Sequence, residues 1–238
     1  MEGDVREVGS VRRASIQARS YTLLGTGKVV GDATLGRGDV QGFLTVGGRL
    51  AADEFRCDGG LEVGSTTTVK GHLDLRGDAE LGGAVSAGEI HSKGTVRVAG
   101  SIQVNGLATI DGVLVSTGPV TTRGLTLTGG LTVGGTIEAP TVTIRLRKAS
   151  RATSILSPHV RIVRASPFLS SSTTLTVDRI EGVEVELEGV DCEYVRAERV
   201  RLGAGCHVTR LDGAILRRHR TAVVGPLSRV DPPFGMSR

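Results

Sequence analysis

Residues 69–85, VKGHLDLRGDAELGGAV, alternate between two kinds of side chain. The odd-numbered positions are aliphatic residues or glycine, and the even-numbered positions from Lys70 to Glu80 are all polar. Strand side chains alternate faces with a period of two, so this stretch predicts strands with one buried face and one wet face. A helix is excluded here, because the apolar period is not 3.6 and each interior glycine would cost about 1 kcal/mol relative to alanine.

Glycine recurs every six residues through the middle of the chain, with one slip of a single residue. Glycine suits positions where a chain bends, or where a neighbouring backbone comes too close for a Cβ atom. Three six-residue sides would make a triangular turn of roughly 18 residues, and successive turns would stack as parallel strands about 4.7–4.9 Å apart. The repeat therefore predicts an all-β fold, a parallel β-helix (β-solenoid) of roughly triangular coils. The glycines are Gly71, Gly77, Gly83, Gly88, Gly94, Gly100, Gly106, Gly112, Gly118, Gly124 and Gly130.

The pattern along the chain divides it into five segments. In chain order we expect a flexible N-terminal tail at 1–20, a β-helix with hexad repeats at 21–146, an irregular seam at 147–175, a distal β-helix section at 176–216, and a basic, Pro-containing C-terminal tail at 217–238. Beyond Val120 the apolar parity shifts by one, which requires a bulge or an altered corner. The pattern leaves open whether the distal section stacks on the first or folds back beside it.

Composition narrows the class of protein. Aromatic residues make up 3% of the 238 residues and glycine accounts for 35 of them, which fits thin aliphatic ladders rather than a bulky globular core. The three cysteines have no metal-site or disulfide-framework spacing, and no apolar run approaches the roughly 20 residues needed to cross a bilayer. We therefore expect a cytoplasmic protein without a cleaved signal.

Charge is interspersed along the chain, with a formal net charge of +4. Interspersed charge is typical of a solvated surface, and the exceptions lie near the two ends. These clusters are candidate contacts for anionic lipid or other proteins, while nucleic acid is the less favoured partner. The basic residues concerned are Arg12, Arg13, Arg19, Arg217, Arg218, His219 and Arg220.

The aliphatic-x-Gly-x-aliphatic hexads resemble those of the bactofilins, which are polymer-forming cytoskeletal proteins. The distal stretches IEGVEVELE at 180–188 and VRAERVRLGAGC at 195–206 look like the distal part of long bactofilin-like chains. The resemblance covers about residues 21–216. It implies a right-handed β-helix with unstructured tails, and self-assembly end to end without nucleotide. Bacterial members often carry a hydrophobic N-terminal membrane anchor, and the opening residues MEGDVR do not match one. The expected location is accordingly the cytoplasm, at most peripheral to a membrane.

The ends of a solenoid are the places where self-assembly is physically expected. The first and last coils are open parallel-sheet edges with exposed core residues, and unless capped they template another molecule. We expect the N-terminal contact to use Val29, Leu35, Val40 and Leu44, and the C-terminal contact to use Val200, Leu202, Val208, Leu211 and Ile215. The partner is a second copy of the chain.

Two other classes of protein stay open as alternatives. One is a non-polymerising β-solenoid adaptor that binds a protein or nucleic acid. The other is a hexapeptide-type acyltransferase, a left-handed β-helix in which an edge histidine acts as general base. None of the five histidines is flanked by a loop long enough to build a pocket, and carboxylates such as Asp74 and Glu80 are the wet face of a strand rather than a glycosidase pair.

Cofactor sites are not indicated by the sequence either. Cys192 and Cys206 with His207 lack a fourth metal ligand, and no glycine-rich run is followed by Gly-Lys-Ser/Thr. We therefore expect a structural protein that is not an enzyme, with no cofactor and no small-molecule substrate.

Overall fold

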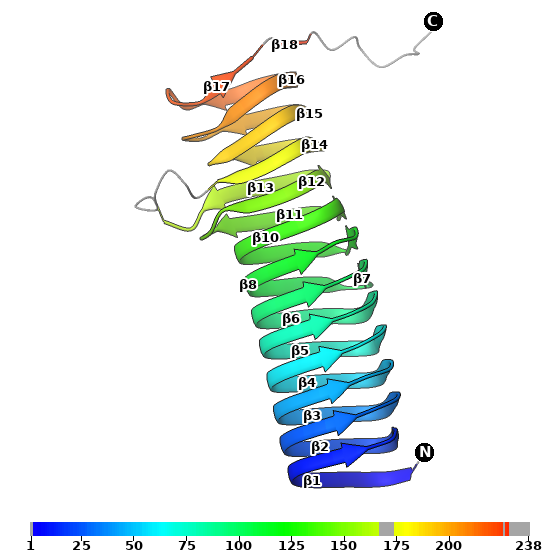
Figure 1. Ribbon diagram of the computed structural model, residues 1–238. Helices are drawn as coiled ribbons and strands as arrows, with labels where there is room; N and C mark the ends of the chain where they lie inside the picture. Colours follow the sequence, from blue (N-terminus) through cyan, green and yellow to red (C-terminus); the bar gives the residue numbers. More distant parts are fainter. Residues whose placement is uncertain (1, 167–173, 226, 229–238) are drawn as a thin grey trace, which may run out of the picture.

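The computed structural model describes residues 2–166, 174–225 and 227–228. These residues form one β-solenoid of about 13 turns, in which the strands pair in parallel and no helix occurs. The coils rise in chain order from the N-terminal end to the C-terminal end (Figure 1). The parallel β-helix predicted from the hexads is confirmed.

The longer strands wrap around a corner of the coil and cover two sides of the triangle. In chain order they are β1 (Glu2–Arg13), β2 (Ile16–Val29), β3 (Ala33–Val46), β4 (Leu50–Val63), β5 (Thr67–Leu81), β6 (Val85–Val98), β7 (Ile102–Val104), β8 (Leu107–Ser116), β9 (Val120–Thr121), β10 (Gly124–Glu138), β11 (Thr141–Leu146), β12 (Ser150–Leu156), β13 (His159–Arg164), β14 (Leu175–Leu187), β15 (Val190–Leu202), β16 (His207–Arg218), β17 (Val223–Val224) and β18 (Leu227–Ser228).

The coil is right-handed. In Figure 1 the strands nearest the viewer run from left to right while the chain climbs away from its N-terminus. This is the hand that crossover connections between parallel strands almost always adopt. It is opposite to the hand expected for an acyltransferase of the hexapeptide type.

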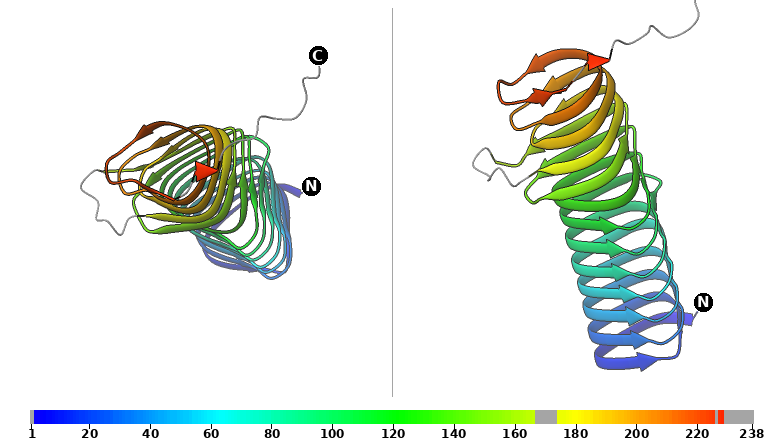
Figure 2. Two further views of the ribbon diagram at one scale, coloured as in Figure 1. Left: turned by 90° about the horizontal axis from the view of Figure 1, so that it is seen from above. Right: turned by 45° about the horizontal axis from the view of Figure 1, so that its top comes forward.

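The coils are three-sided (Figure 2), and the strand register shows that they are not all of one length. Gly59 pairs with Gly77, so the inward positions of both coils are odd-numbered residues. Gly25 pairs with Gly42, so the inward positions change between odd-numbered and even-numbered residues from one coil to the next. The second kind of coil is shorter than the first by one residue. Such short coils produce the slip before Gly88 and the shift after Val120. Beyond β13 the coils shorten further, since Leu175 pairs with Val190.

One corner of the triangle is a column of glycines with positive φ. The inner seven have φ between +120° and +147°, where a side chain would be strained. Successive backbones also meet here, since a Cβ added to Gly59 would lie 2.0 Å from the carbonyl oxygen of Gly42. Glycine is therefore required at this corner both for its positive φ and for the close approach of the neighbouring backbone. The column comprises Gly9, Gly25, Gly42, Gly59, Gly77, Gly94, Gly112 and Gly129.

The core is a set of ladders, each made of residues that stack in register on successive coils. Val29, Val46 and Val63 form part of one ladder and are all buried. In another ladder Gly38 lies between Tyr21 and Phe55, and a Cβ at Gly38 would come within 2.4 Å of the Phe55 ring. A glycine thus makes room for the two large rings in an otherwise aliphatic interior.

The expected flexible tail at 1–20 is wrong for its described residues. β1 and β2 cover nearly all of it and pair in parallel from Glu2 to Arg13, with Gly9 beginning the corner column. The alternation was hidden because two of the inward positions of β1 carry charged residues, Glu7 and Arg13, instead of aliphatic ones.

The seam and the C-terminal tail also differ from the expectation. Strands β12 and β13 fill much of 147–175 and pair with β14, so the distal section stacks directly on the first. Residues 167–173 of that seam lie outside the described residues. The predicted tail from 217 onward includes the end of β16 and the short strands β17 and β18, while its last residues, 229–238, are likewise outside them.

Substitution of a corner glycine tests how strongly the backbone contact constrains the stack. We expect Gly59→Ala to lower the free energy of unfolding by roughly 2–4 kcal/mol, because the new Cβ meets a fixed backbone oxygen. Gly189→Ala is the matched control, since Gly189 also has positive φ but a Cβ there meets the side chain of Arg164, which can move. Its expected cost is about 1 kcal/mol. Denaturant unfolding followed by circular dichroism measures both, and equal losses would contradict the steric explanation.

Candidate assembly surfaces at the coil ends

Both ends of the stack present strand edges with unpaired backbone. Among the described residues, no strand pairs with β1 on the side away from β2. At the other end, β17 and β18 pair with the first half of β16, while among the residues that the structure describes its second half, residues 214–218, pairs only with β15. Unpaired N–H and C=O groups in a row are a template for another strand.

The four residues predicted for the N-terminal contact lie inside the stack rather than on its outer coil. Val29 belongs to β2, and Leu35, Val40 and Leu44 belong to β3. All four are buried, and β1 forms the outer coil instead. The surface available for assembly at this end is therefore one to two coils further toward the N-terminus than expected.

The residues predicted for the C-terminal contact divide into two groups. Val200 and Leu202 lie in β15 beneath β16, and Val208 and Leu211 lie beneath β17 and β18, so these four are buried. Only Ile215 remains partly exposed on the outer coil. Of the nine predicted contact residues, it alone is on a terminal surface.

Aliphatic residues of the core are incompletely covered at the two ends of the stack. Three partly buried residues pack against the core, namely Val5 in β1, Ile215 in β16 and Val224 in β17. Each lacks a neighbour on its outer side among the described residues. Covering them with another coil would remove apolar surface from water, at about 25 cal/mol per Å².

The N-terminal coil also holds a buried carboxylate, that of Glu7. Its Oε2 atom accepts a hydrogen bond from the Tyr21 hydroxyl at 2.8 Å, and its Oε1 atom lies 2.6 Å from Nη2 of Arg13. The Glu7 side chain is only 6% exposed, whereas that of Arg13 is 55% exposed. A buried carboxylate needs such partners, because desolvation would otherwise be prohibitive.

This cluster of Glu7, Arg13 and Tyr21 was not predicted from the sequence. A signal for it does exist, because Gly9 precedes Gly25 by one coil length and Glu7 then falls on the inward position below Leu23. Polar residues at inward positions break the apolar pattern by which coils were recognised. The terminal coil was therefore the hardest one to find.

The opposite end carries an arginine in the same register position. Arg218 is paired with the buried Leu202, and its Nε and Nη2 atoms donate to the carbonyl oxygen of Ala222 at 3.1 and 3.0 Å. Its side chain thus reaches across the corner that follows β16. The basic clusters expected in the tails are, as far as they are described, part of the terminal coils.

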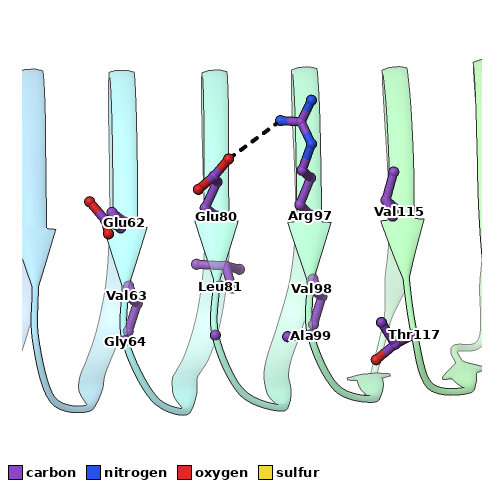
Figure 3. A pocket seen from close by; sticks show the side chains of 11 residues that line it. Glu62, Val63, Gly64, Glu80, Leu81, Arg97, Val98, Ala99, Val115 and Thr117 are labelled. Atoms are coloured by element: carbon purple, nitrogen blue, oxygen red, sulfur yellow. Dashed lines mark ion pairs between the residues drawn. The ribbon is translucent and has the colours of Figure 1, made fainter.

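The flanks of the rod offer an open groove of about 400 Å³. Figure 3 shows Glu62, Glu80 and Arg97 in one row on successive strands, with Glu80 and Arg97 forming an ion pair at 3.8 Å. Small residues such as Gly64 and Ala99 line its floor. Charged groups paired across coils are typical of a wet strand face.

All five histidines are exposed, on outer faces or at corners. Three of them lie next to carboxylates of adjacent coils, with nitrogen-to-oxygen distances of 3.3 Å for His72 and Glu89, 3.7 Å for His159 and Glu184, and 3.4 Å for His207 and Asp191. Within the described ranges, no group of three histidine, cysteine or acidic residues is arranged to hold a metal ion.

Comparisons with protein-family models, curated proteins and solved structures found no match. In the part of the chain that the structure describes, no helix has the length and apolar character to span a membrane.

Tyr21 makes the N-terminal cluster sensitive to alkali. Burial, followed by the hydrogen bond to Glu7, raises the pKa of Tyr21 well above its ordinary value of 10.0. The folded chain therefore keeps this proton where the unfolded chain releases it, so the stabilisation is complete below about pH 10 and is lost as pH rises above that value. We expect the thermal midpoint of the wild type to fall more steeply above about pH 10 than that of Tyr21→Phe. Parallel pH profiles of the two proteins would contradict this.

The cysteines should be inert in the folded protein. Cys57, Cys192 and Cys206 are free and buried, and burial raises the pKa of Cys57 and of Cys192 to about 12. Because only the thiolate reacts, we expect no labelling by a maleimide in native buffer and three labels after denaturation, as measured by mass spectrometry. Labelling of any one thiol in the native protein would show that its coil opens.

Proposed function

We propose that this protein assembles with copies of itself, end to end and without nucleotide, into a filament that serves as a scaffold. The observation that carries the proposal is the gathering of incompletely covered core residues, Val5, Ile215 and Val224, on the two terminal coils, beside unpaired strand edges. Each end therefore has apolar side chains and a strand edge that a coil of another copy would cover.

The rest of the fold suits a scaffold. About 13 turns at about 4.8 Å per turn give a rod roughly 60 Å long, whose every interior coil is held by hydrogen bonds to both neighbours. Repeats that contact only their neighbours can be extended without changing the interior. A further copy would therefore lengthen the rod with the same chemistry that holds it together.

The same proposal places the protein in the cytoplasm, at most peripheral to a membrane. Its support is the presence of three unpaired, buried cysteines, which suits a reducing compartment. The partner is the chain itself, and the scaffold needs neither a cofactor nor a substrate. The resemblance to bactofilins in the hexads supports the same function.

Charge placed on the end surfaces should weaken assembly. We expect Val5→Asp and Ile215→Asp each to raise the protein concentration needed for assembly about tenfold or more, because the new carboxylate would be buried without a partner. Sedimentation and negative-stain electron microscopy in nucleotide-free buffer measure this. The matched control is Leu107→Asp, which changes an aliphatic residue, 56% exposed, in the middle of the rod.

Two results would count against the proposal, and a third would require another variant. Wild-type protein that stays as single particles over a wide range of salt and concentration would overturn it and favour the adaptor. An equal effect of Leu107→Asp would move the contact from the ends to the flank. Loss of the β-sheet circular dichroism signal in an end variant would mean that the variant unfolds, and in that case Val224→Asp replaces it.

A further inference from the structure

One core ladder ends in opposite charges at the two ends of the rod. It runs without a charged residue through the whole stack, from Leu23 in β2 to Leu202 in β15. The register places Glu7 on Leu23 at the N-terminal end and Arg218 on Leu202 at the C-terminal end. The ladder comprises Leu23, Val40, Cys57, Leu75, Ser92, Ile110, Leu127, Ile144, Ile162, Leu187 and Leu202.

The two charged groups differ in how they are held. The Glu7 carboxylate is buried and fixed by Tyr21 and Arg13. The Arg218 side chain is exposed and uses two of its five N–H donors on the carbonyl of Ala222. One end therefore presents a carboxylate held rigidly in an ion pair with Arg13, and the other presents a cationic group with further donors.

From this we infer that copies join head to tail, with the N-terminal coil of one copy on the C-terminal coil of the next, so that Glu7 faces Arg218. The inference rests on the proposed function and adds a direction to the filament. Head-to-head and tail-to-tail contacts would set β1 against β1 and residues 214–218 against residues 214–218, and neither continues the register that brings Glu7 next to Arg218. The head-to-tail contact alone continues this register and places the Glu7 carboxylate beside a cation of the next copy.

The backbone supports the same orientation. All described strands pair in parallel, and a head-to-tail contact continues that pairing with β1 lying on residues 214–218. Val5 would then continue the ladder of Val200 and Ile215, and Arg13 would continue that of Val208 and Val224. The incompletely covered aliphatic residues of the two ends would cover one another.

One pair opposes this contact. In the same register Arg6 would lie beside Arg217 on the outer face, and both are exposed. Exposed charge pairs contribute little and are screened by salt. The outer pair therefore opposes the contact only weakly, and moderate salt should reduce its repulsion.

Cross-linking of cysteines placed at the two ends reads the orientation directly. Arg6→Cys and Arg217→Cys put exposed thiols on positions that meet only in the head-to-tail register, and the three native cysteines are buried. We expect a short bismaleimide to give dimers when the two variants are mixed, a ladder of multimers from the double variant, and no product from either variant alone. Dimers of Arg6→Cys alone would show a head-to-head contact, and dimers of Arg217→Cys alone a tail-to-tail contact, and either result overturns the inference.

Charge reversal tests the pair itself. We expect Arg218→Glu, which alters an exposed side chain, to raise the concentration needed for assembly about tenfold or more. We expect Glu7→Gln, which removes the charge but keeps a group able to accept from Tyr21, to weaken assembly in the same direction. Assembly of Arg218→Glu at the wild-type concentration overturns the pairing.

The two levels of proposal fail differently. If the wild type does not assemble, both the filament and its direction are wrong. If the wild type assembles but the cross-links join like ends, the scaffold stands and only the head-to-tail direction falls.

Discussion

The close stacking of backbone on backbone at the glycine corner is the constraint on which the other features depend. From Gly9 to Gly129, each carbonyl oxygen of the column lies close to the place where a Cβ on the next glycine would be, so only glycine fits this corner at the spacing set by the backbone hydrogen bonds. The register of the same backbone pairing decides which side chains form ladders. Tyr21 and Phe55 fit only because Gly38 lies between them.

A stack held by neighbours leaves its ends unsatisfied, and the chemistry of the two end coils departs from that of the interior for this reason. Inner coils bury aliphatic residues on both sides, whereas β1 carries Glu7 and Arg13 at inward positions and β16 ends in Arg218. Inward charges on an edge are a known means of preventing indiscriminate strand addition. In the proposed filament they also favour the contact that brings Glu7 next to Arg218 of another copy.

The sequence allowed the coil to be predicted well because interior positions obey one rule. The odd residues from Val69 to Val85 are buried or lie at corners, and the even ones from Lys70 to Glu80 face outward, as the alternation requires. The end coils could not be predicted in the same way. The apolar pattern places Val29 and Leu35 on the outer coil because β1 breaks that pattern, although Gly9 keeps the corner spacing. Nor could the direct stacking of β14 on β12 be derived, since the coil between them is lengthened by residues outside the repeat.

The buried Glu7 shows how stability and specificity separate in such a fold. Replacing its ion pair by aliphatic residues would be neutral or favourable for the isolated rod, because desolvation offsets much of the attraction between buried charges. An aliphatic end, however, would accept any apolar edge, including a second copy of itself in the wrong direction. In the filament that we propose, a buried carboxylate fixed by Tyr21 and Arg13 would disfavour those partners at little cost to the fold. Within that proposal, the cluster contributes to the choice of partner more than to the stability of the coil.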